Sequence, residues 1–362
     1  MAKSKQKFIP TVSVIVPMYN VEDYIAECLQ SLLNQTLENI EVIVVDDCST
    51  DNSVAIVKAF LPKFEGRLNL MRMGKNSGYP GPPRNTALGA TKGEYIYFLD
   101  SDDFIDKTAL EDLYKVAKEF DADVVHVEKY FPFAEADNMR DYEAHSFQEG
   151  GFVDKPTLET FDIGQRVIDF TQKKYLWWGC NKLLRRKMLV DNKIKFPQMT
   201  SFEDLVFAYM CLISAKNYVR VPFVSYYYRV RKNSLSHDAR SVVEVIANMT
   251  KAIAALDDFM IHRKFFIDNP KIRYSMIEFF TQWRLDATVK FNFYSGGPNL
   301  EELFVMYYDG VFSKKPGENA ALTTWLFVAT NLYKLHIQNL EKQVAELKEQ
   351  LAKFQTKEEN VN

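Results

Sequence analysis

The chain has 362 residues, of which 47% are hydrophobic and 26% are charged, and this balance is typical of a globular protein. Its length favours two domains, or one domain with an appendage. The formal net charge of −3 gives no global basic field, which argues against nucleic acid as a partner.

The first 130 residues alternate between strand and helix patterns. Continuous apolar runs rich in β-branched and aromatic residues predict buried strands at 11–17, 41–45, 68–73, 95–99 and 123–127. Helical spacing predicts helices at 21–33, 53–60, 84–91 and 107–120, and Gly93 is expected to end the third of these. The alternation predicts an α/β fold, a mostly parallel sheet with helices on both faces.

The later parts of the chain follow other patterns. Residues 131–170 are of mixed polarity, and we expect an excursion or flap there. Residues 242–308 are helical in pattern and rich in aromatic residues. We therefore expect a catalytic α/β domain over 1–237, a helical domain over 238–330 and a terminal helix over 331–362.

Apolar residues recur in the tail at alternating steps of three and four. They are Ile337, Leu340, Val344, Leu347, Leu351 and Phe354. Ile or Val at the first core position and Leu mostly at the second favour a parallel, two-stranded coiled coil, and hence a homo-oligomer. The alternative is one amphipathic helix that packs on its own body.

Neither a membrane span nor a targeting segment is evident. No stretch reaches the roughly 18 apolar residues that a membrane span needs. Residues 320–333 are shorter, and we favour a buried helix there, with a position on a membrane surface as the alternative. The N-terminus does not resemble a signal peptide, and the four widely spaced cysteines suggest reduced thiols. We expect a cytoplasmic protein, with the inner face of the cell membrane as an alternative location.

Polar residues follow each of the first four predicted strands. In chain order they are Pro17, Tyr19 and Asn20; Asp46 and Asp47; Asn76, Arg84 and Asn85; and Asp100, Asp102 and Asp103. Ligands of open α/β sheets bind beyond the carboxyl ends of the strands, so we expect these residues at one rim. Carboxylates gathered there would repel one another unless they hold a hard cation. The D-x-D pattern predicts Mg²⁺ or Mn²⁺ bound together with phosphate oxygens; an acidic turn without metal is the alternative.

Four motifs, SVIVPMYN, VVDDCSTDNS, KNSGYPGPPRNTALGATKGEYIYFLDSDD and FEDLVF, carry a resemblance to a known family. In this order they resemble glycosyltransferase family 2, of the GT-A (Rossmann-like) fold, over about residues 11–237. The resemblance implies a nucleotide-sugar donor, Mn²⁺ or Mg²⁺ as cofactor, and inversion at the anomeric carbon. There is a weaker similarity to wall-teichoic-acid glycosyltransferases. We expect a UDP-sugar donor and a glycan or polyol-phosphate acceptor.

The same resemblance implies roles for individual residues. Those assigned to the nucleotide sugar are Pro17, Tyr19, Asp47, Asn76, Arg84 and Asp100. Within this set Tyr19 would lie against the base, Asp47 would accept a hydrogen bond from the uracil N–H, and Arg84 would touch base and ribose. Asp102 would ligate the metal that bridges the diphosphate.

The catalytic pair implied by the resemblance is Glu203-Asp204. Asp204 would be the general base that takes the proton of the acceptor hydroxyl, and Glu203 would help to position it. Without the resemblance, an acidic pair before an apolar helix is an N-terminal cap, and the two readings are compatible.

Two further segments carry candidate residues. Residues 226–237 are basic and resemble the family's mobile loop, which implies phosphate contacts by Arg231, Ser234 and His237; a solvated loop is the alternative. Trp177 and Trp178 are candidates for a sugar platform or for core packing. Lys182 follows them and is expected to meet an anionic acceptor or to lie on a solvated helix face.

Other classes of function fit less well. The turn after the first strand has no glycine, which excludes the phosphate loops of dehydrogenases and nucleotidyltransferases. A non-catalytic scaffold that assembles partners through the coiled coil is the remaining alternative. The intact set of acidic residues argues against it.

Overall fold

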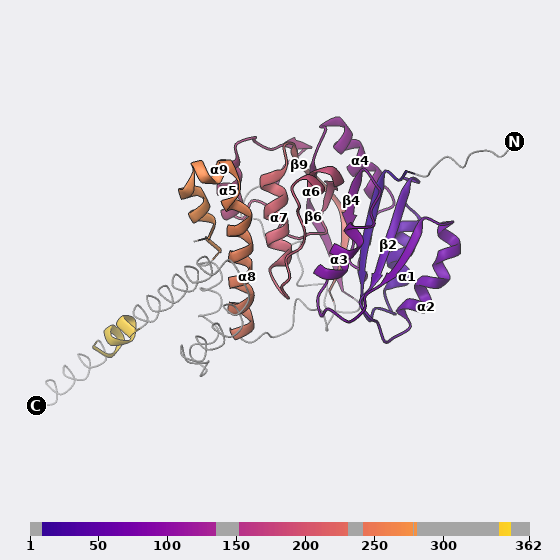
Figure 1. The fold of residues 1–362 in the computed structure, drawn as a ribbon, viewed down its shortest axis with the longest axis horizontal. Helices are drawn as coiled ribbons and strands as arrows, with labels where there is room; N and C mark the ends of the chain where they lie inside the picture. Colours follow the sequence, from indigo (N-terminus) through magenta and orange to yellow (C-terminus); the bar gives the residue numbers. More distant parts are fainter. Residues whose placement is uncertain (1–8, 135–151, 231–241, 278, 281–339, 349–362) are drawn as a thin grey trace, which may run out of the picture. The chain divides into compact units, whose positions relative to one another are not determined.

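The computed structural model describes residues 9–134, 152–230, 242–277, 279–280 and 340–348. The chain divides into two units, residues 1–240 with 258–276, and residues 241–257 with 277–362. The first unit holds the sheet and the candidate site (Figure 1). The expected domain boundaries at 237 and 330 fall outside the described residues and stay predictions.

Four parallel strands form the first half of the sheet, in the order β3-β2-β1-β4. Their bounds are Val12–Met18 for β1, Ile40–Asp46 for β2, Leu68–Arg72 for β3 and Tyr95–Phe98 for β4. Every residue of β1, β2 and β4 is buried, as expected of a parallel sheet covered on both faces. The predicted strands in this part of the chain are confirmed.

Helices cover both faces of this parallel half (Figure 1). The helices in this part of the chain are α1 (Ile25–Leu33), α2 (Ser53–Phe60), the short 3₁₀ helix η1 (Leu61–Phe64), α3 (Gly81–Leu88) and α4 (Ala109–Glu119). Alternate residues of β1 form one core with buried residues of α1, α2 and α4. On the opposite face Phe98 of β4 packs edge-on against Phe196 and Phe207, with ring centroids 5.1 and 5.6 Å apart.

The second half of the sheet is mixed, which corrects the expectation of a mostly parallel sheet. Its strands are β5 (Phe104–Ile105), β6 (Val124–Ala134), β7 (Thr157–Leu158), β8 (Lys182–Arg185) and β9 (Tyr218–Val230). Strand β8 lies between β4 and β6 and is antiparallel to both, β6 and β9 are parallel, and β5 and β7 pair antiparallel with β9. Between β6 and β8 the chain forms β7 beside β9, and β8 then fills the place beside β4.

The later helices complete the described fold. They are α5 (Ile163–Thr171), α6 (Arg186–Asp191), α7 (Glu203–Ser214), α8 (Val242–Ile261) and α9 (Lys264–Asp268). Helix α7 carries ten buried residues and lies against the sheet through Phe207. Its first turn, with Glu203 and Asp204, is thereby fixed at the sheet.

Gly93 does not end a helix, because α3 already ends at Leu88. Instead it packs against β1, and its N–H donates to the hydroxyl of Ser13 at 2.8 Å. A Cβ atom at position 93 would lie 2.5 Å from the backbone nitrogen of Ser13 and 2.9 Å from the carbonyl oxygen of Tyr95. The position therefore has no room for a side chain.

We expect Gly93→Ala to lower the free energy of unfolding by about 1–3 kcal/mol, because the new methyl group meets backbone that cannot move aside. Gly89→Ala is the matched control, since its Cβ would have its nearest neighbour at 3.5 Å, an ordinary contact. Urea unfolding of both variants tests this, and equal stability of the two would contradict it.

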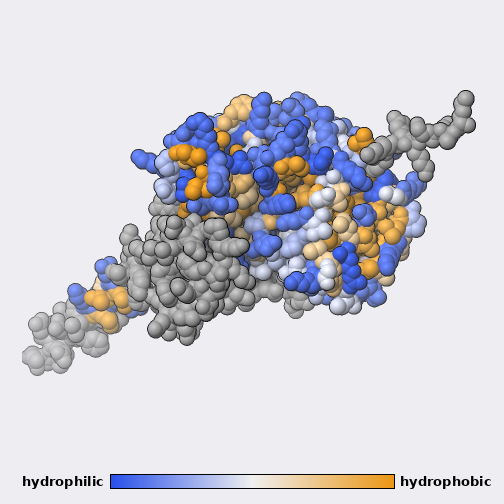
Figure 2. All heavy atoms as spheres, in the orientation of Figure 1, coloured by the Kyte–Doolittle hydropathy of each residue, from blue (hydrophilic) through white to orange (hydrophobic). Residues whose placement is uncertain are grey.

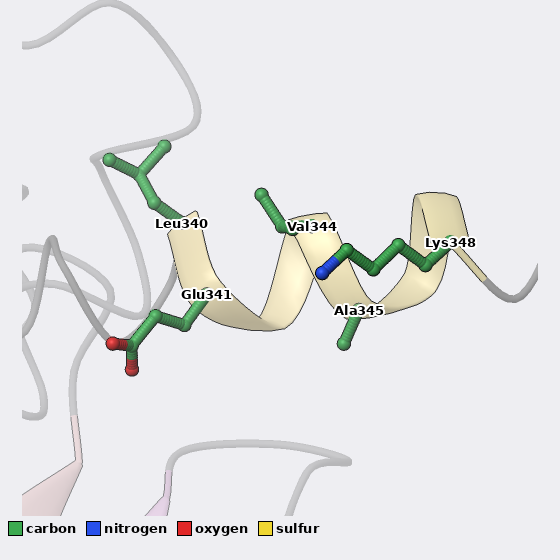
Figure 3. Close-up of a pocket in the computed structure, with 5 residues that line it drawn as sticks. All are labelled: Leu340, Glu341, Val344, Ala345 and Lys348. Atoms are coloured by element: carbon green, nitrogen blue, oxygen red, sulfur yellow. The ribbon is translucent and has the colours of Figure 1, made fainter.

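Residues 340–348 form a helix in the second unit. Leu340 and Val344 project to one side of it, and Glu341 and Ala345 to another (Figure 3). Leu340, Val344 and Leu347 are 45%, 48% and 63% exposed. This agrees with an amphipathic helix over these residues. The rest of the repeat, and the segment 320–333, lie outside the described residues, so the coiled coil and the homo-oligomer stay predictions.

No helix among the described residues is long and apolar enough to span a bilayer. Hydrophilic atoms cover much of the face that Figure 2 presents, with smaller hydrophobic areas between them. All four cysteines are free thiols, and three of them are buried. The expectation of reduced cysteines is in accord with this arrangement.

Candidate active site

The first side of the candidate site is the turn after β1. Pro17 is buried within β1, whereas Tyr19 is 47% exposed just beyond the strand's carboxyl end. Asn20 adopts a left-handed conformation, with φ of 47°, and its side-chain oxygen accepts a hydrogen bond from the N–H of Thr50 at 2.8 Å. This bond ties the turn after β1 to the turn after β2. Tyr19 is therefore an exposed aromatic residue in a turn at the rim, where an aromatic base could stack on it.

Asp47 holds the loop after β3 against the end of β2. Its carboxylate is buried and accepts hydrogen bonds from the N–H of Ser77, at 3.0 Å to each oxygen, and from the Ser77 hydroxyl at 2.7 Å. Asn76 is exposed, and its side-chain oxygen accepts from the N–H of Gly78 at 2.7 Å. Asp47 and Asn76 thus lie on one side of the site, and both of them shape the loop.

Arg84 lies at the centre of the site. It is 1% exposed, and its two terminal nitrogens donate to Asp100 and to Asp204, each at 2.7 Å. Its guanidinium also lies 5.0 Å from the ring centroid of Phe196. A buried guanidinium with two carboxylate partners is well compensated and rigidly held. Arg84 therefore joins the end of β4 to the start of α7, an arrangement that its predicted contact with base and ribose did not include.

Asp204 lies in the first turn of α7. Besides Arg84, the backbone of Gly179 lies against its carboxylate, and a Cβ atom at position 179 would be 3.0 Å from Oδ1. Burial raises the pKa of Asp204, and the nearby Arg84 opposes the rise. The side chain is still 28% exposed. Asp204 is thus a solvent-reachable carboxylate whose proton affinity is increased, which is the property required of a general base.

Glu203 precedes Asp204 and is 8% exposed. Its charge, after burial, raises the pKa of Tyr79 in the loop after β3. The loop that Asp47 holds therefore lies within electrostatic range of the start of α7. In this way the structure gathers the predicted residues after β2, β3 and β4 and the acidic pair of α7 around one region.

The three carboxylates in the D-x-D turn after β4 have different surroundings. Asp100 pairs with Arg84. Asp103 is buried and accepts hydrogen bonds from the Tyr226 hydroxyl at 2.5 Å and from the Arg229 N–H at 2.8 Å. Burial, followed by repulsion from Asp102 and Asp100, raises the pKa of Asp103 well above its usual range. Asp102 is half-buried between them.

A divalent cation fits this turn through the chemistry of its donors. Among the described residues no group of three or more His, Cys, Asp or Glu side chains is arranged to hold a metal ion. Mg²⁺ and Mn²⁺, however, are usually bound by one or two carboxylates together with substrate phosphates. Asp100, Asp102 and Asp103 lie within four residues of one another, and a cation would neutralise part of the repulsion between their charges.

Arg229 donates hydrogen bonds to the D-x-D turn. Its Nε donates to the backbone carbonyl of Asp102 at 2.9 Å, and its guanidinium forms an ion pair with Glu27 of α1. Arg229 is 5% exposed, so it belongs to the body of the domain. The loop residues Arg231, Ser234 and His237 lie outside the described residues, and their phosphate contacts stay predictions.

Lys182 was misjudged from the sequence, because it lies on β8 and is 1% exposed. Its ammonium group donates to the carbonyls of Leu176 and Trp178, at 2.9 and 2.5 Å. It therefore lies neither on a solvated helix face nor at the surface, where an acceptor could bind. A lysine followed by two leucines in a short strand is the only signal of this in the sequence.

Trp178 belongs to an aromatic cluster beside the site. Its ring lies 4.5 Å from that of Tyr130 and 5.4 Å from that of Tyr228, centroid to centroid. Trp177 and Trp178 are both half-buried. Trp178 thus takes part in core packing and keeps an accessible portion, so both predicted roles are compatible with its position.

Comparisons with known proteins identify the family of the chain. The family described as "Glycosyl transferase family 2" matches residues 13–191. A glycosyltransferase of Streptococcus pneumoniae, GlyG, is 30% identical over 272 residues, which cover 70% of this chain and 85% of that protein. A poly(ribitol-phosphate) beta-glucosyltransferase of Bacillus spizizenii is 37% identical over 225 residues, which cover 61% of this chain. The matched region is 32% of that relative, so the chain spans about a third of its length.

A solved structure is similar over most of the chain. It is TarS 1–349 of S. aureus in complex with UDP-GlcNAc, with 28% sequence identity and a TM-score of 0.62. The similarity covers 81% of this chain and 77% of the other. The fold that the motifs implied is therefore found in an experimental structure with a bound nucleotide sugar.

Proposed function

The chain belongs to glycosyl transferase family 2, and from this premise we propose that it transfers a sugar from a UDP-sugar to a hydroxyl group of a cell-surface polysaccharide or teichoic-acid-like acceptor. The transfer inverts the anomeric carbon, and Asp204 is the general base. The beta-glucosyltransferase relative supports inversion, because a β-linkage made from an α-linked UDP-sugar is an inverted one.

One observation carries the proposal: the Arg84 guanidinium donates to Asp100 and Asp204 at the same time. It places the predicted base beside the end of β4, where the donor is expected to bind. Because the attacking hydroxyl must meet the anomeric carbon in line, base and donor sugar have to be held on one scaffold. Arg84 supplies that link through a buried, charged contact at each end.

The proton path follows from the same contacts. Asp204 in its ionised form accepts the proton of the acceptor hydroxyl as that oxygen attacks the sugar. The pair with Arg84 holds one carboxylate oxygen, Oδ1, and fixes the orientation of the group. Glu203 lies at the start of the same helix and helps to position the base.

Donor binding is assigned to the rim formed by the ends of β1, β2 and β3. The ring of Tyr19 would stack on the base. The Asp47 carboxylate would accept a hydrogen bond from the uracil N–H in addition to those it accepts from Ser77. Asn76 lies in the loop between them. The complex of TarS with UDP-GlcNAc supports a UDP-sugar as the donor.

Asp102 would hold Mn²⁺ or Mg²⁺, with Asp100 beside it. When bound, such a cation neutralises charge that develops on the leaving diphosphate. We expect Asp102→Ala to raise the Mn²⁺ concentration needed for UDP-GlcNAc binding by about tenfold or more, because a metal ligand is lost. The measurement is the Mn²⁺ dependence of the Tm rise that UDP-GlcNAc causes.

Asp112→Ala on α4 is the matched control, since its side chain is 46% exposed on the helix surface. It should show the wild-type Mn²⁺ dependence. If Asp102→Ala shows that dependence as well, Asp102 is not the ligand.

Release of UDP from UDP-GlcNAc or UDP-glucose separates the enzyme from the scaffold alternative. We expect turnover with Mn²⁺ that increases when a ribitol-phosphate oligomer is added as acceptor. Binding of both nucleotide sugars without release of UDP under any of these conditions would favour the scaffold.

A further inference from the structure

The peptide between Trp178 and Gly179 is held from both ends by charged side chains. Its carbonyl oxygen accepts a hydrogen bond from the ammonium group of Lys182 at 2.5 Å. Its N–H, which belongs to Gly179, faces the carboxylate of Asp204 and lowers the pKa of that group. The described chain has no cis peptide, so this C=O and N–H point in opposite directions. One peptide plane thus lies between a buried cation and the proposed base.

Lys182 also fixes the turn that carries this peptide. Its ammonium donates to the carbonyl of Leu176 at 2.9 Å, two residues before Trp178. The side chain is 1% exposed, and its strand β8 is paired with β4 and β6. Because β8 is paired on both sides, the position of Lys182 is fixed. Its hydrogen bonds therefore also fix the position of residues 176–178.

The glycine in this peptide is required by close packing. A Cβ atom at position 179 would lie 3.0 Å from Oδ1 of Asp204 and 3.2 Å from the ring of Phe196. This is independent evidence that the peptide is pressed against the base. A side chain there would push either the carboxylate or the peptide away.

We propose that Lys182 is a positioning residue for the base: it orients the Trp178–Gly179 peptide so that the N–H faces the carboxylate of Asp204. The inference rests on the proposed function of Asp204. A peptide whose oxygen is bound to an ammonium group is polarised, which makes its N–H a stronger donor to a carboxylate. The ionised form of the base is stabilised and its direction is set.

The buried environment agrees with this role. Burial lowers the pKa of Lys182 to about 8, so the lysine is cationic below that pH, and its charge lowers the pKa of Asp204. The charged and titratable groups around the pair are Arg84, Asp100, Cys180, Glu203, Cys211 and His126. Arg84 of α3 binds the same carboxylate through Oδ1, so Lys182 and Arg84 together determine its geometry.

Lys182→Met removes the charge and the two hydrogen bonds while keeping a chain of similar length. We expect the acid limb of the kcat/KM profile to move up by about one pH unit, because the pKa of Asp204 rises when the nearby cation is lost and the Gly179 N–H is no longer held toward the carboxylate. The Kd for UDP-GlcNAc with Mn²⁺ should stay within about twofold of wild type. Lys187→Met on α6, an exposed position, is the matched control and should change neither quantity.

Gly179→Ala is a second variant that alters the same peptide. Near-UV circular dichroism and UDP-GlcNAc binding report whether each variant is folded. If Lys182→Met does not fold, Gly179→Ala decides: a raised acid limb supports the inference and an unchanged profile overturns it. A folded Lys182→Met protein with the wild-type pH profile also overturns it. Asp204→Asn separates this result from the proposed function. Full activity of Asp204→Asn would remove Asp204 as the base. If Asp204→Asn is inactive and the pH profile of Lys182→Met is not shifted, only the role of Lys182 is contradicted.

Discussion

Asp204→Asn is expected to lower kcat by about 100- to 10,000-fold, the range in which a general base contributes to a reaction. An amide cannot accept the proton of the acceptor hydroxyl, but it has the size of the carboxylate and can still accept from Arg84. The Kd for UDP-GlcNAc should change by less than about threefold, since the donor contacts lie at the ends of other strands. Steady-state kinetics and calorimetry measure the two quantities separately.

Asp121→Asn is the matched control for this substitution. The Asp121 carboxylate is 83% exposed, and its ion-pair partner within the described residues is Arg185. It should retain wild-type kcat. A fully active Asp204→Asn protein would require another base. A variant that loses donor affinity as well as kcat would show that Asp204 organises the binding site.

Arg220→Met is expected to lower the free energy of unfolding by about 3–5 kcal/mol. Arg220 is 5% exposed and forms ion pairs with Glu128 and with Glu159, the latter at 2.5 Å. Glu159 also accepts from the ammonium of Lys174 and from the Tyr175 hydroxyl. Removing the arginine leaves two buried carboxylates without their main cation, which is the costly way to break a buried pair.

Equilibrium urea unfolding of the full chain measures this effect. Lys187→Met breaks an exposed pair with Asp191 and should cost no more than about 0.5 kcal/mol. Adding Glu128→Gln to Arg220→Met should restore part of the stability, because it removes one of the uncompensated charges. A loss as small as that of Lys187→Met would show that the network around Arg220 contributes little.

The parallel half of the sheet could be predicted from the sequence, because its strands are continuous apolar runs between recognisable helices. The place of β8 could not. It has four residues, begins with a lysine, and is separated from β4 by more than 80 residues of chain. Local periodicity carries no information on which distant strand fills the position beside β4.

The site was predictable as a set of residues but not as a network. The rule that ligands bind beyond the strand ends pointed to the carboxylates after β2 and β4, and these strands are parallel, so their carboxyl ends lie at one edge of the sheet. It gave no sign that Arg84 faces inward between Asp100 and Asp204, or that Asp103 is bound by Tyr226. Charged residues are mostly exposed, so a buried Lys182 or Arg220 runs against the general tendency that sequence reasoning depends on.

The anomeric configuration of the product tests the central claim most directly. A base that activates the acceptor for a single in-line displacement turns an α-linked UDP-sugar into a β-linked product. Proton NMR of the product formed from UDP-GlcNAc or UDP-glucose and a ribitol-phosphate oligomer should therefore show a β-linkage from the first turnover. An α-linked product would contradict direct displacement with Asp204 as the base.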